Sequence, residues 1–242
     1  MPRIRIDLSY KGTYFHGWQI QENAITVQGE LNKALATILQ ENIETVGCGR
    51  TDTGVHAKKY TAHFDCNTIN DVNKLKYHLN KVLSKDISIN DISETYMGFH
   101  ARFDALKRTY KYFIHTKKNP FLTEYSTFYP FALDVEIMNN AAKFLLGKRD
   151  FTSFSKLNTD VENNYCEVFE AYWEQNEDGY IFTISANRFL RNMVRAIVGT
   201  MQELSKNKDL DFAEIIEAKD RCKAGISAPP QGLFLWDNKY II

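Results

Sequence analysis

The order of strand and helix patterns along the chain restricts its fold more than any other feature of the sequence. In residues 3–10, Ile4, Ile6 and Leu8 alternate with polar residues, which is typical of a strand buried on one face. From Val27 to Leu39 the hydrophobic residues recur at helical spacing instead, behind a threonine that favours a helix N-cap. Both patterns recur to the end of the chain, so we expect a mixed α+β protein.

These patterns divide between two similar halves. In the first half, further strands are expected at 44–49, 59–65 and 88–96, and a helix is expected after Asp71. In the second half, the expected elements are a strand at 108–115, a helix at 135–146 closed by Gly147, a hairpin of strands 166–175 and 180–187, helices at 194–204 and about 211–222, and a closing strand at 232–242. We therefore predict two α/β halves, residues 1–105 and 106–242, with a cleft between them.

The sequence also carries expectations about where the protein works. We find no run of about 18 hydrophobic residues, so no membrane span is expected. The N-terminal stretch MPRIRIDLSY lacks the apolar core of a signal peptide. The four cysteines lie far apart without a C-x-x-C pair, which argues against a zinc cluster or a disulfide framework. We therefore expect a protein of the reducing cytoplasm.

Charge is balanced overall but unevenly distributed. The chain has 30 basic and 30 acidic residues. Residues 100–118 hold six basic residues against one acidic, residues 186–202 hold three basic and no acidic, and residues 160–178 hold seven acidic and no basic. Separate basic and acidic surfaces fit a polyanion that is bound in one place. Charge runs are also typical of solvated faces, so charge alone leaves both interpretations open.

The stretch GRTDTGVHA, residues 49–57, contains Asp52 in a D-T-G triplet like that of aspartic proteases. Such a protease needs two carboxylates about 3 Å apart that share a proton. The chain has no second D-T-G or D-S-G, and Arg50 two residues earlier favours an ionised carboxylate. A protease is therefore disfavoured. For an isolated T-D-T-G a structural turn is the better explanation, because these residue types favour turns.

Six stretches together resemble the tRNA pseudouridine synthase A family, in order and at sensible spacing from about residue 4 to the C-terminus. They are KGTYFHGWQIQ (11–21), TVQGELNKAL (26–35), GRTDTGVHA (49–57), FHARFDALKRTYKY (99–112), ANRFLRNMVRAIVGT (186–200) and AGISAPPQGLFL (224–235). The resemblance implies a pseudouridine synthase fold with a central antiparallel sheet. It also implies isomerisation of uridine to pseudouridine at positions 38, 39 and 40 of the tRNA anticodon stem-loop, by a homodimer that needs neither cofactor nor metal.

The resemblance also implies roles for individual residues. Asp52 matches the essential aspartate of the family, Tyr110 its active-site tyrosine, and Arg195 the arginine that pairs with the aspartate. Leu233 matches the apolar residue near the target base, and Arg50 matches the arginine of the G-R-T-D motif. The basic residues expected to contact the substrate RNA are Arg50, Lys58, Arg102, Arg108 and Arg188. Thr53 stands where many members have alanine.

Pseudouridine formation explains why these residue types are needed. The N1–C1′ bond breaks, the free uracil turns, and C5 joins C1′. A carboxylate can assist by covalent attack on the sugar or base, or by taking the C2′ proton, and the sequence leaves both routes open. In a partly dry site Asp52 would need a cationic partner. Arg195 borders the hydrophobic stripe of its expected helix, where it can donate a bidentate hydrogen bond.

Three other function classes fit the sequence less well. A non-catalytic RNA-binding protein on the same fold is disfavoured by the presence of Asp52 and Tyr110. A hydrolase that uses the D-T-G carboxylate lacks its partner motif. A zinc nucleobase deaminase is excluded because H-x-E and P-C-x-x-C are missing.

Overall fold

The computed structural model describes residues 1–67, 69–156 and 163–241, and the chain divides into two compact units. Unit 1 comprises Met1–Leu106 together with Leu235–Ile242, and unit 2 comprises Lys107–Phe234. Most of the closing strand thus groups with the N-terminal unit, although it is more than a hundred residues away in the sequence. The fold class is confirmed as mixed α/β, with a sheet and helices in each unit.

The sheet of unit 1 has the strand order β4-β1-β3-β10, with the short β2 beside β3. The strand β1 pairs antiparallel with both β3 and β4. The bounds are β1 Arg3–Tyr10, β2 Val46–Gly47, β3 His56–Asp65, β4 Ile87–Thr95 and β10 Leu233–Tyr240. As the alternation predicts, Ile4, Ile6 and Leu8 are buried on one face of β1.

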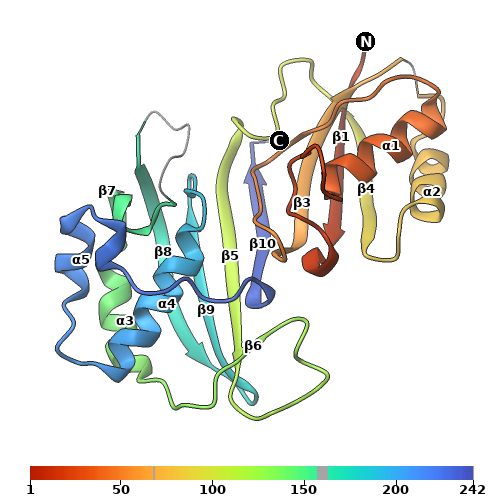
Figure 1. Ribbon diagram of the computed structural model, residues 1–242. Coiled ribbons are helices and arrows are strands. Elements are labelled where there is room, and N and C mark those ends of the chain that lie inside the picture. Colours follow the sequence, from red (N-terminus) through yellow and green to blue (C-terminus); the bar gives the residue numbers. More distant parts are fainter. Residues whose placement is uncertain (68, 157–162, 242) are drawn as a thin grey trace. The chain divides into compact units, whose positions relative to one another are not determined.

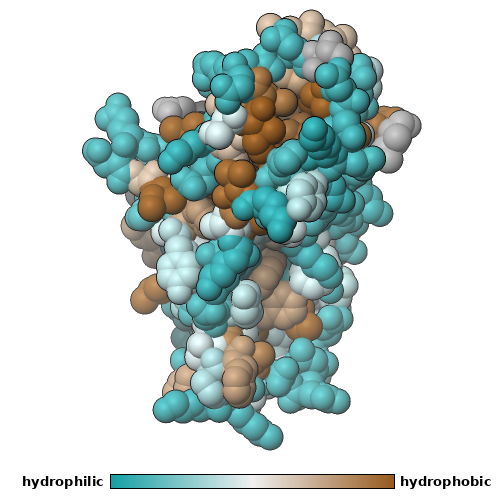
Figure 2. Space-filling model, turned by 90° about the vertical axis from the view of Figure 1, so that its right-hand side faces the viewer, coloured by the Kyte–Doolittle hydropathy of each residue, from teal (hydrophilic) through white to brown (hydrophobic). Residues whose placement is uncertain are grey.

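Two capped helices accompany this sheet, α1 (Val27–Leu39) and α2 (Val72–Val82). The Thr26 side chain accepts a hydrogen bond from the Gly29 N–H, and Asp71 accepts from two N–H groups of the first turn of α2. Both predicted caps are therefore confirmed. In Figure 1 the two helices lie side by side, with α2 next to β4. Figure 2, which shows the face on the right-hand side of Figure 1, has several groups of hydrophobic surface residues separated by hydrophilic ones.

The sheet of unit 2 has the order β5-β9-β8-β7, and its long strands pair antiparallel. The bounds are β5 Ala105–His115, β6 Thr127–Phe128, β7 Gly147–Asp150, β8 Tyr165–Gln175 and β9 Gly179–Ala186. Three helices belong to this unit, α3 (Val135–Lys143), α4 (Met193–Lys206) and α5 (Phe212–Ala218). Figure 1 shows α3 and α4 on the same side of β8 and β9. The Trp173 indole on β8 donates to the Met201 sulfur on α4, which ties this helix to the sheet.

Four short 3-10 helices complete the described secondary structure. They are η1 Gly12–Tyr14, η2 Thr152–Phe154, η3 Arg221–Lys223 and η4 Pro230–Gly232. The helix expected at about 211–222 is in fact two elements, because Lys219 adopts a left-handed conformation and Asp220 caps η3. The helix expected at 135–146 ends earlier, at Lys143. The strand expected at 44–49 is reduced to β2.

Neither a membrane helix nor a disulfide is found in the part of the chain that the structure describes. No helix there is long and apolar enough to cross a membrane. The four cysteines all lie in this part and none of them forms a disulfide. The described part of the chain also holds no group of three or more His, Cys, Asp or Glu side chains that could bind a metal ion.

Candidate active site

Asp52 lies in the loop between β2 and β3, and its side chain is partly buried. The Asp52 carbonyl accepts a hydrogen bond from the Val55 N–H at 3.1 Å, which closes a tight turn. Within this turn Gly54 has a φ of +79°, a conformation that glycine adopts without steric cost. The turn residues therefore present the carboxylate from a backbone that is hydrogen-bonded on both sides of it.

A second segment, residues 15–19, forms backbone hydrogen bonds with this loop. The Gly54 N–H donates to the Phe15 carbonyl and the Trp18 N–H donates to the Thr51 carbonyl, both at 3.3 Å. Gly17 has a φ of +82°, and a Cβ at this position would lie 2.3 Å from the Thr51 oxygen. The FHGWQ motif thus has a physical explanation, because only glycine lets these two backbones approach so closely.

Buried side chains support the loop from beneath. The Tyr10 and Thr51 hydroxyls are 2.8 Å apart, and the Tyr60 hydroxyl donates to the Gly49 carbonyl. The Trp18 and Tyr60 rings stack with their centroids 4.1 Å apart. Such support from several segments is what keeps a reacting group in one geometry. The loop of Asp52 is therefore held by side chains from β1, β3 and segment 15–19.

His56 also orders the loop rather than offering a free imidazole. Its Nδ1 accepts a hydrogen bond from the Gly12 N–H at 3.0 Å, and the side chain is buried. A Cβ at Gly12 would lie 2.0 Å from the Val55 carbonyl oxygen, so Gly12 too is required by a close approach. The segment that begins with Gly12 and the loop of Asp52 are thus in close contact at several points.

The predicted RNA-contacting cations of unit 1 are all exposed. They are Arg50, Lys58 and Arg102. The Lys58 ammonium lies over the Trp236 ring at 3.9 Å, and the Arg102 guanidinium lies 5.6 Å from the Phe103 ring centroid. A cation over an aromatic ring keeps its charge accessible while its side chain is held in place. Trp236 was not singled out from the sequence, because its contact with Lys58 joins residues far apart in the chain.

Tyr110 lies on β5 opposite Ile184 of β9, and it is 8% exposed. Its ring meets the Phe189 ring edge-on, with centroids 4.9 Å apart. Its strand neighbour Tyr112 is fully buried, and burial raises the pKa of the Tyr112 hydroxyl. Tyr112 is therefore a structural residue of the core.

Arg108 and Arg188, the predicted RNA-contacting cations of unit 2, are less exposed than those of unit 1. Arg108 is 8% exposed and donates from Nη1 to the Asn187 carbonyl at 2.6 Å. Arg188 is partly buried. The acidic block predicted at 160–178 lies in part on β8, where Glu170 pairs with Lys107 at 2.8 Å. Residues 160–162 of that block lie outside the described residues.

Arg195 lies on α4 and its side chain is partly buried, which matches its predicted place at the border of the hydrophobic stripe. The Nε of Arg195 donates to the Ala228 carbonyl at 2.7 Å. Leu233 opens β10 directly after η4 and is 5% exposed. Tyr110, Arg195 and Leu233 thus all belong to unit 2, whereas Asp52 belongs to unit 1.

A buried histidine beside the segment of Arg102 has a strongly perturbed pKa. His63 on β3 is 4% exposed, and its Nδ1 accepts a hydrogen bond from the Ala101 N–H at 3.1 Å. Burial, together with the positive charges of Arg3 and His100, lowers the pKa of His63 from 6.5 to about 4, although Asp65 and Asp104 oppose the shift. Protonation of Nδ1 would remove the acceptor that the Ala101 N–H uses.

We expect this histidine to make the folded protein less stable in mild acid. The unfolded chain binds a proton near pH 6.5 and the folded chain only near pH 4, so stability is lost as pH falls between these values. From pH 7 to 4.5 the loss should be about 2 kcal/mol. Urea unfolding over this range should show it in the wild type, and a His63→Asn variant should lose most of the dependence. His78→Asn, a change on α2, is the control. An equal pH dependence in all three proteins would contradict the prediction.

A family model described as tRNA pseudouridine synthase matches residues 141–240. This stretch contains Arg195 and Leu233, and it begins after Asp52 and Tyr110 in the sequence. The match therefore covers α4, which carries Arg195, and the closing strand β10.

Curated relatives extend the similarity to nearly the whole chain. The chain is 51% identical over 243 residues to the tRNA pseudouridine synthase A of Parabacteroides distasonis, covering 99% of this chain and 96% of the relative. It is 50% identical to the tRNA pseudouridine synthase A of Bacteroides fragilis, covering 99% and 97%. A more distant relative is the tRNA pseudouridine synthase A of Thermoanaerobacter sp., 41% identical with 97% and 98% covered. The similarity therefore spans both units.

Proposed function

The chain belongs to the tRNA pseudouridine synthase A family, a family of isomerases that form pseudouridine in tRNA, and from this premise we propose a specific site and catalyst. The substrate positions are uridines 38, 39 and 40 of the anticodon stem-loop. The essential catalyst is the carboxylate of Asp52. These two statements go beyond the family's general activity, and each has its own test.

The observation that carries the proposal is the way Asp52 is held. Its loop is bonded to residues 15–19 on one side and supported by Tyr10 and Tyr60 beneath. A group that reacts with an extruded nucleotide has to stand in one geometry, because misplacement by about 1 Å costs roughly 100-fold in rate. An ordinary surface turn has no need of three glycines and four aromatic or hydroxyl side chains fitted to it.

The proposed reaction is an internal rearrangement. The N1–C1′ bond breaks, the uracil turns, C5 bonds to C1′, and the proton from C5 leaves to solvent while N1 gains one. Asp52 assists either by bonding to the substrate and leaving again, or by taking the C2′ proton and returning it. In both cases the carboxylate has to be ionised when the substrate arrives.

The other predicted residues have distinct roles in this proposal. Tyr110 stacks on the uracil ring, and its hydroxyl gives or takes a proton. Arg195 pairs with the Asp52 carboxylate and so offsets the cost of an anion in a partly dry site. Leu233 packs on the base.

Binding of the stem-loop would rest mainly on phosphates, because proteins recognise helical RNA by its shape and backbone. The proposed contacts are Arg50, Lys58, Arg102, Arg108 and Arg188, acting in a homodimer. Lys58 is already oriented by Trp236. Raised salt should therefore weaken binding of the stem-loop steeply.

The site specificity can be tested with short anticodon stem-loops that carry C5-tritiated uridine at one position only. We expect tritium release to water from RNAs labelled at 38, 39 or 40, because joining C5 to C1′ expels the hydrogen on C5. An RNA whose only labelled uridine lies elsewhere in the same stem-loop is the control, and it should release none. Release from the control alone would contradict the proposed positions, and no release from any tRNA would contradict the proposed activity.

A further inference from the structure

Segment 224–229, between η3 and η4, lies along α4 and bonds to Arg195 twice. The Ala228 carbonyl accepts from the Arg195 Nε at 2.7 Å, and the Ala228 N–H donates to the Arg195 carbonyl at 2.9 Å. The next carbonyl, that of Pro229, accepts from the Tyr112 hydroxyl at 2.8 Å. The guanidinium is therefore held at Nε, and any acidic partner has to be met by its two terminal nitrogens.

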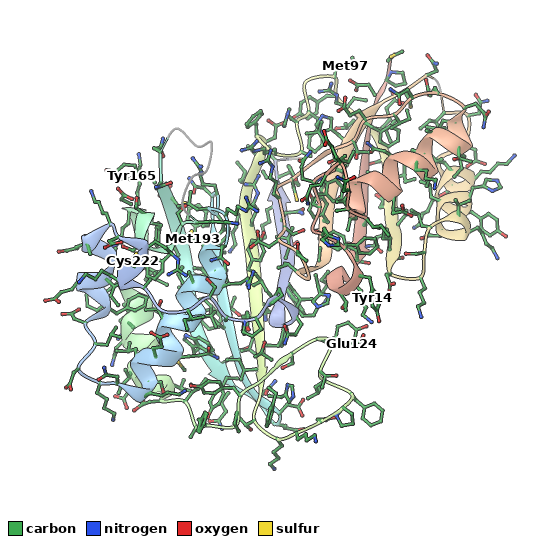
Figure 3. The ribbon with its side chains drawn as sticks, in the orientation of Figure 1. Tyr14, Met97, Glu124, Tyr165, Met193 and Cys222 are labelled. Atoms are coloured by element: carbon green, nitrogen blue, oxygen red, sulfur yellow. The ribbon has the colours of Figure 1, made fainter. Side chains whose placement is uncertain are left out.

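One hydroxyl of this segment accepts hydrogen bonds from two side chains. The Ser227 Oγ accepts from the Asn192 Nδ2 at 2.6 Å and from an Arg221 terminal nitrogen at 3.0 Å. Asn192 stands at the N-cap of α4 with a φ of +67°, and its side chain bonds to Ser227 instead of capping the helix. Figure 3 labels Met193, which follows Asn192 at the start of α4, and Cys222, which follows Arg221 in η3.

Further bonds fix the register of the segment on the helix. The Gly225 N–H donates to the Thr200 hydroxyl at 2.9 Å, and the Ile226 N–H donates to the Glu203 carboxylate at 3.1 Å. A Cβ at Gly199 would lie 1.8 Å from the Ile226 oxygen, so the segment sits directly on the helix backbone. The segment is thus attached to α4 before and after Ser227.

We propose that Ser227, through segment 224–229, is a positioning residue for the Arg195 guanidinium. It holds the Ala228 carbonyl where Nε–H meets it, and so determines the direction in which the two terminal nitrogens point. The catalytic part of this inference rests on the proposed role of Arg195. Ser227 itself touches neither substrate nor carboxylate in this account. Its loss would leave Asn192 and Arg221 without their shared acceptor and would remove the side-chain contacts next to Ala228, while the backbone bonds of Gly225 and Ile226 to α4 remain.

The kinetic test is Ser227→Ala, assayed by tritium release from tRNA. We expect kcat to fall about 10- to 100-fold while KM changes less than about 3-fold, because geometry is altered and not binding. Ser227→Thr retains the hydroxyl and should restore most of kcat. Ser205→Ala is the matched control, because it also removes a hydrogen-bonded serine hydroxyl, one that lies on α4 and accepts from the Asp134 N–H. Equal losses of kcat in the Ser227→Ala and Ser205→Ala proteins would overturn the inference.

Two further measurements distinguish positioning from a general loss of stability. In an Arg195→Lys background, which lacks the Nε donor, Ser227→Ala should change kcat less than about 3-fold, and a full additive loss would overturn the inference. Hydrogen exchange at the Arg195 Nε, followed by NMR, should be slow in the wild type and at least about 10-fold faster in Ser227→Ala. An unchanged exchange rate at the Arg195 Nε in Ser227→Ala would overturn the inference. Absence of tritium release from the wild type would contradict the proposed function instead, and the exchange measurement does not depend on it.

Discussion

Replacing Asp52 by asparagine should lower the rate of pseudouridine formation at least about 1,000-fold, while the protein still folds and binds tRNA. Asparagine keeps the size of the side chain but can neither attack carbon nor take a proton. The loop should keep its shape, because the bonds that Phe15, Trp18, Tyr10 and Tyr60 make with it involve backbone groups or other side chains. The loss should therefore fall on kcat.

The measurement is single-turnover tritium release from C5-labelled tRNA, with tRNA binding followed separately on a filter. Asp91→Asn is the matched control, because it neutralises an exposed carboxylate of the same unit on β4 and should leave the rate unchanged. Activity within about 10-fold of the wild type in a purified Asp52→Asn protein would refute a catalytic carboxylate at this position. Loss of tRNA binding together with activity would assign Asp52 to binding instead.

Gly199→Ala should both destabilise the protein and inactivate it. In an ordinary helix this change adds about 1 kcal/mol of stability, since glycine is a poor helix former. Here the new Cβ would lie 1.8 Å from the Ile226 carbonyl oxygen, which belongs to backbone and cannot rotate away. Displacing segment 224–229 should cost more than the helix gains, for a net loss of about 2 kcal/mol. We also expect kcat to fall about 100-fold, because Arg195 loses its fixed contact with Ala228.

Urea unfolding and tritium release on the same preparation measure both effects. Gly98→Ala is the control, since the nearest atom to its new Cβ would lie 3.5 Å away, an ordinary contact. If Gly199→Ala raised stability by about 1 kcal/mol and left kcat unchanged, segment 224–229 would not be held as described.

Several elements could be predicted from the sequence because their causes are local. Thr26 and Asp71 cap helices within the next three residues, and the alternation of Ile4, Ile6 and Leu8 is a property of one strand. The family was also identified correctly from motifs alone, because six stretches in one order are hard to match by chance. An error arose where the helical pattern continued beyond the end of the helix, as at Lys219, whose left-handed conformation ends α5 before η3.

The residues that fix the candidate site were missed for the opposite reason. Gly17 reads as a generic turn glycine until Thr51 is known to lie against it. Ser227 is one serine among many until Asn192 and Arg221 are seen to share its hydroxyl. Ser227 lies 35 residues from Asn192, and Gly17 and Thr51 are similarly far apart, so periodicity over one element contains no information about these contacts.

By itself, the sequence determined the family and most of the order of the elements, and it predicted Asp52, Tyr110 and Arg195 as residues of the active site. Only the tertiary structure decided how the predicted residues are held. The loop of Asp52 lies against Gly17, Lys58 lies over Trp236, and the Arg195 Nε donates to the Ala228 carbonyl. The physical reason is range. Hydrophobic period and capping act over a few neighbouring residues, whereas the direction of a side chain is set by whichever distant backbone offers it a hydrogen-bond partner or excludes a Cβ.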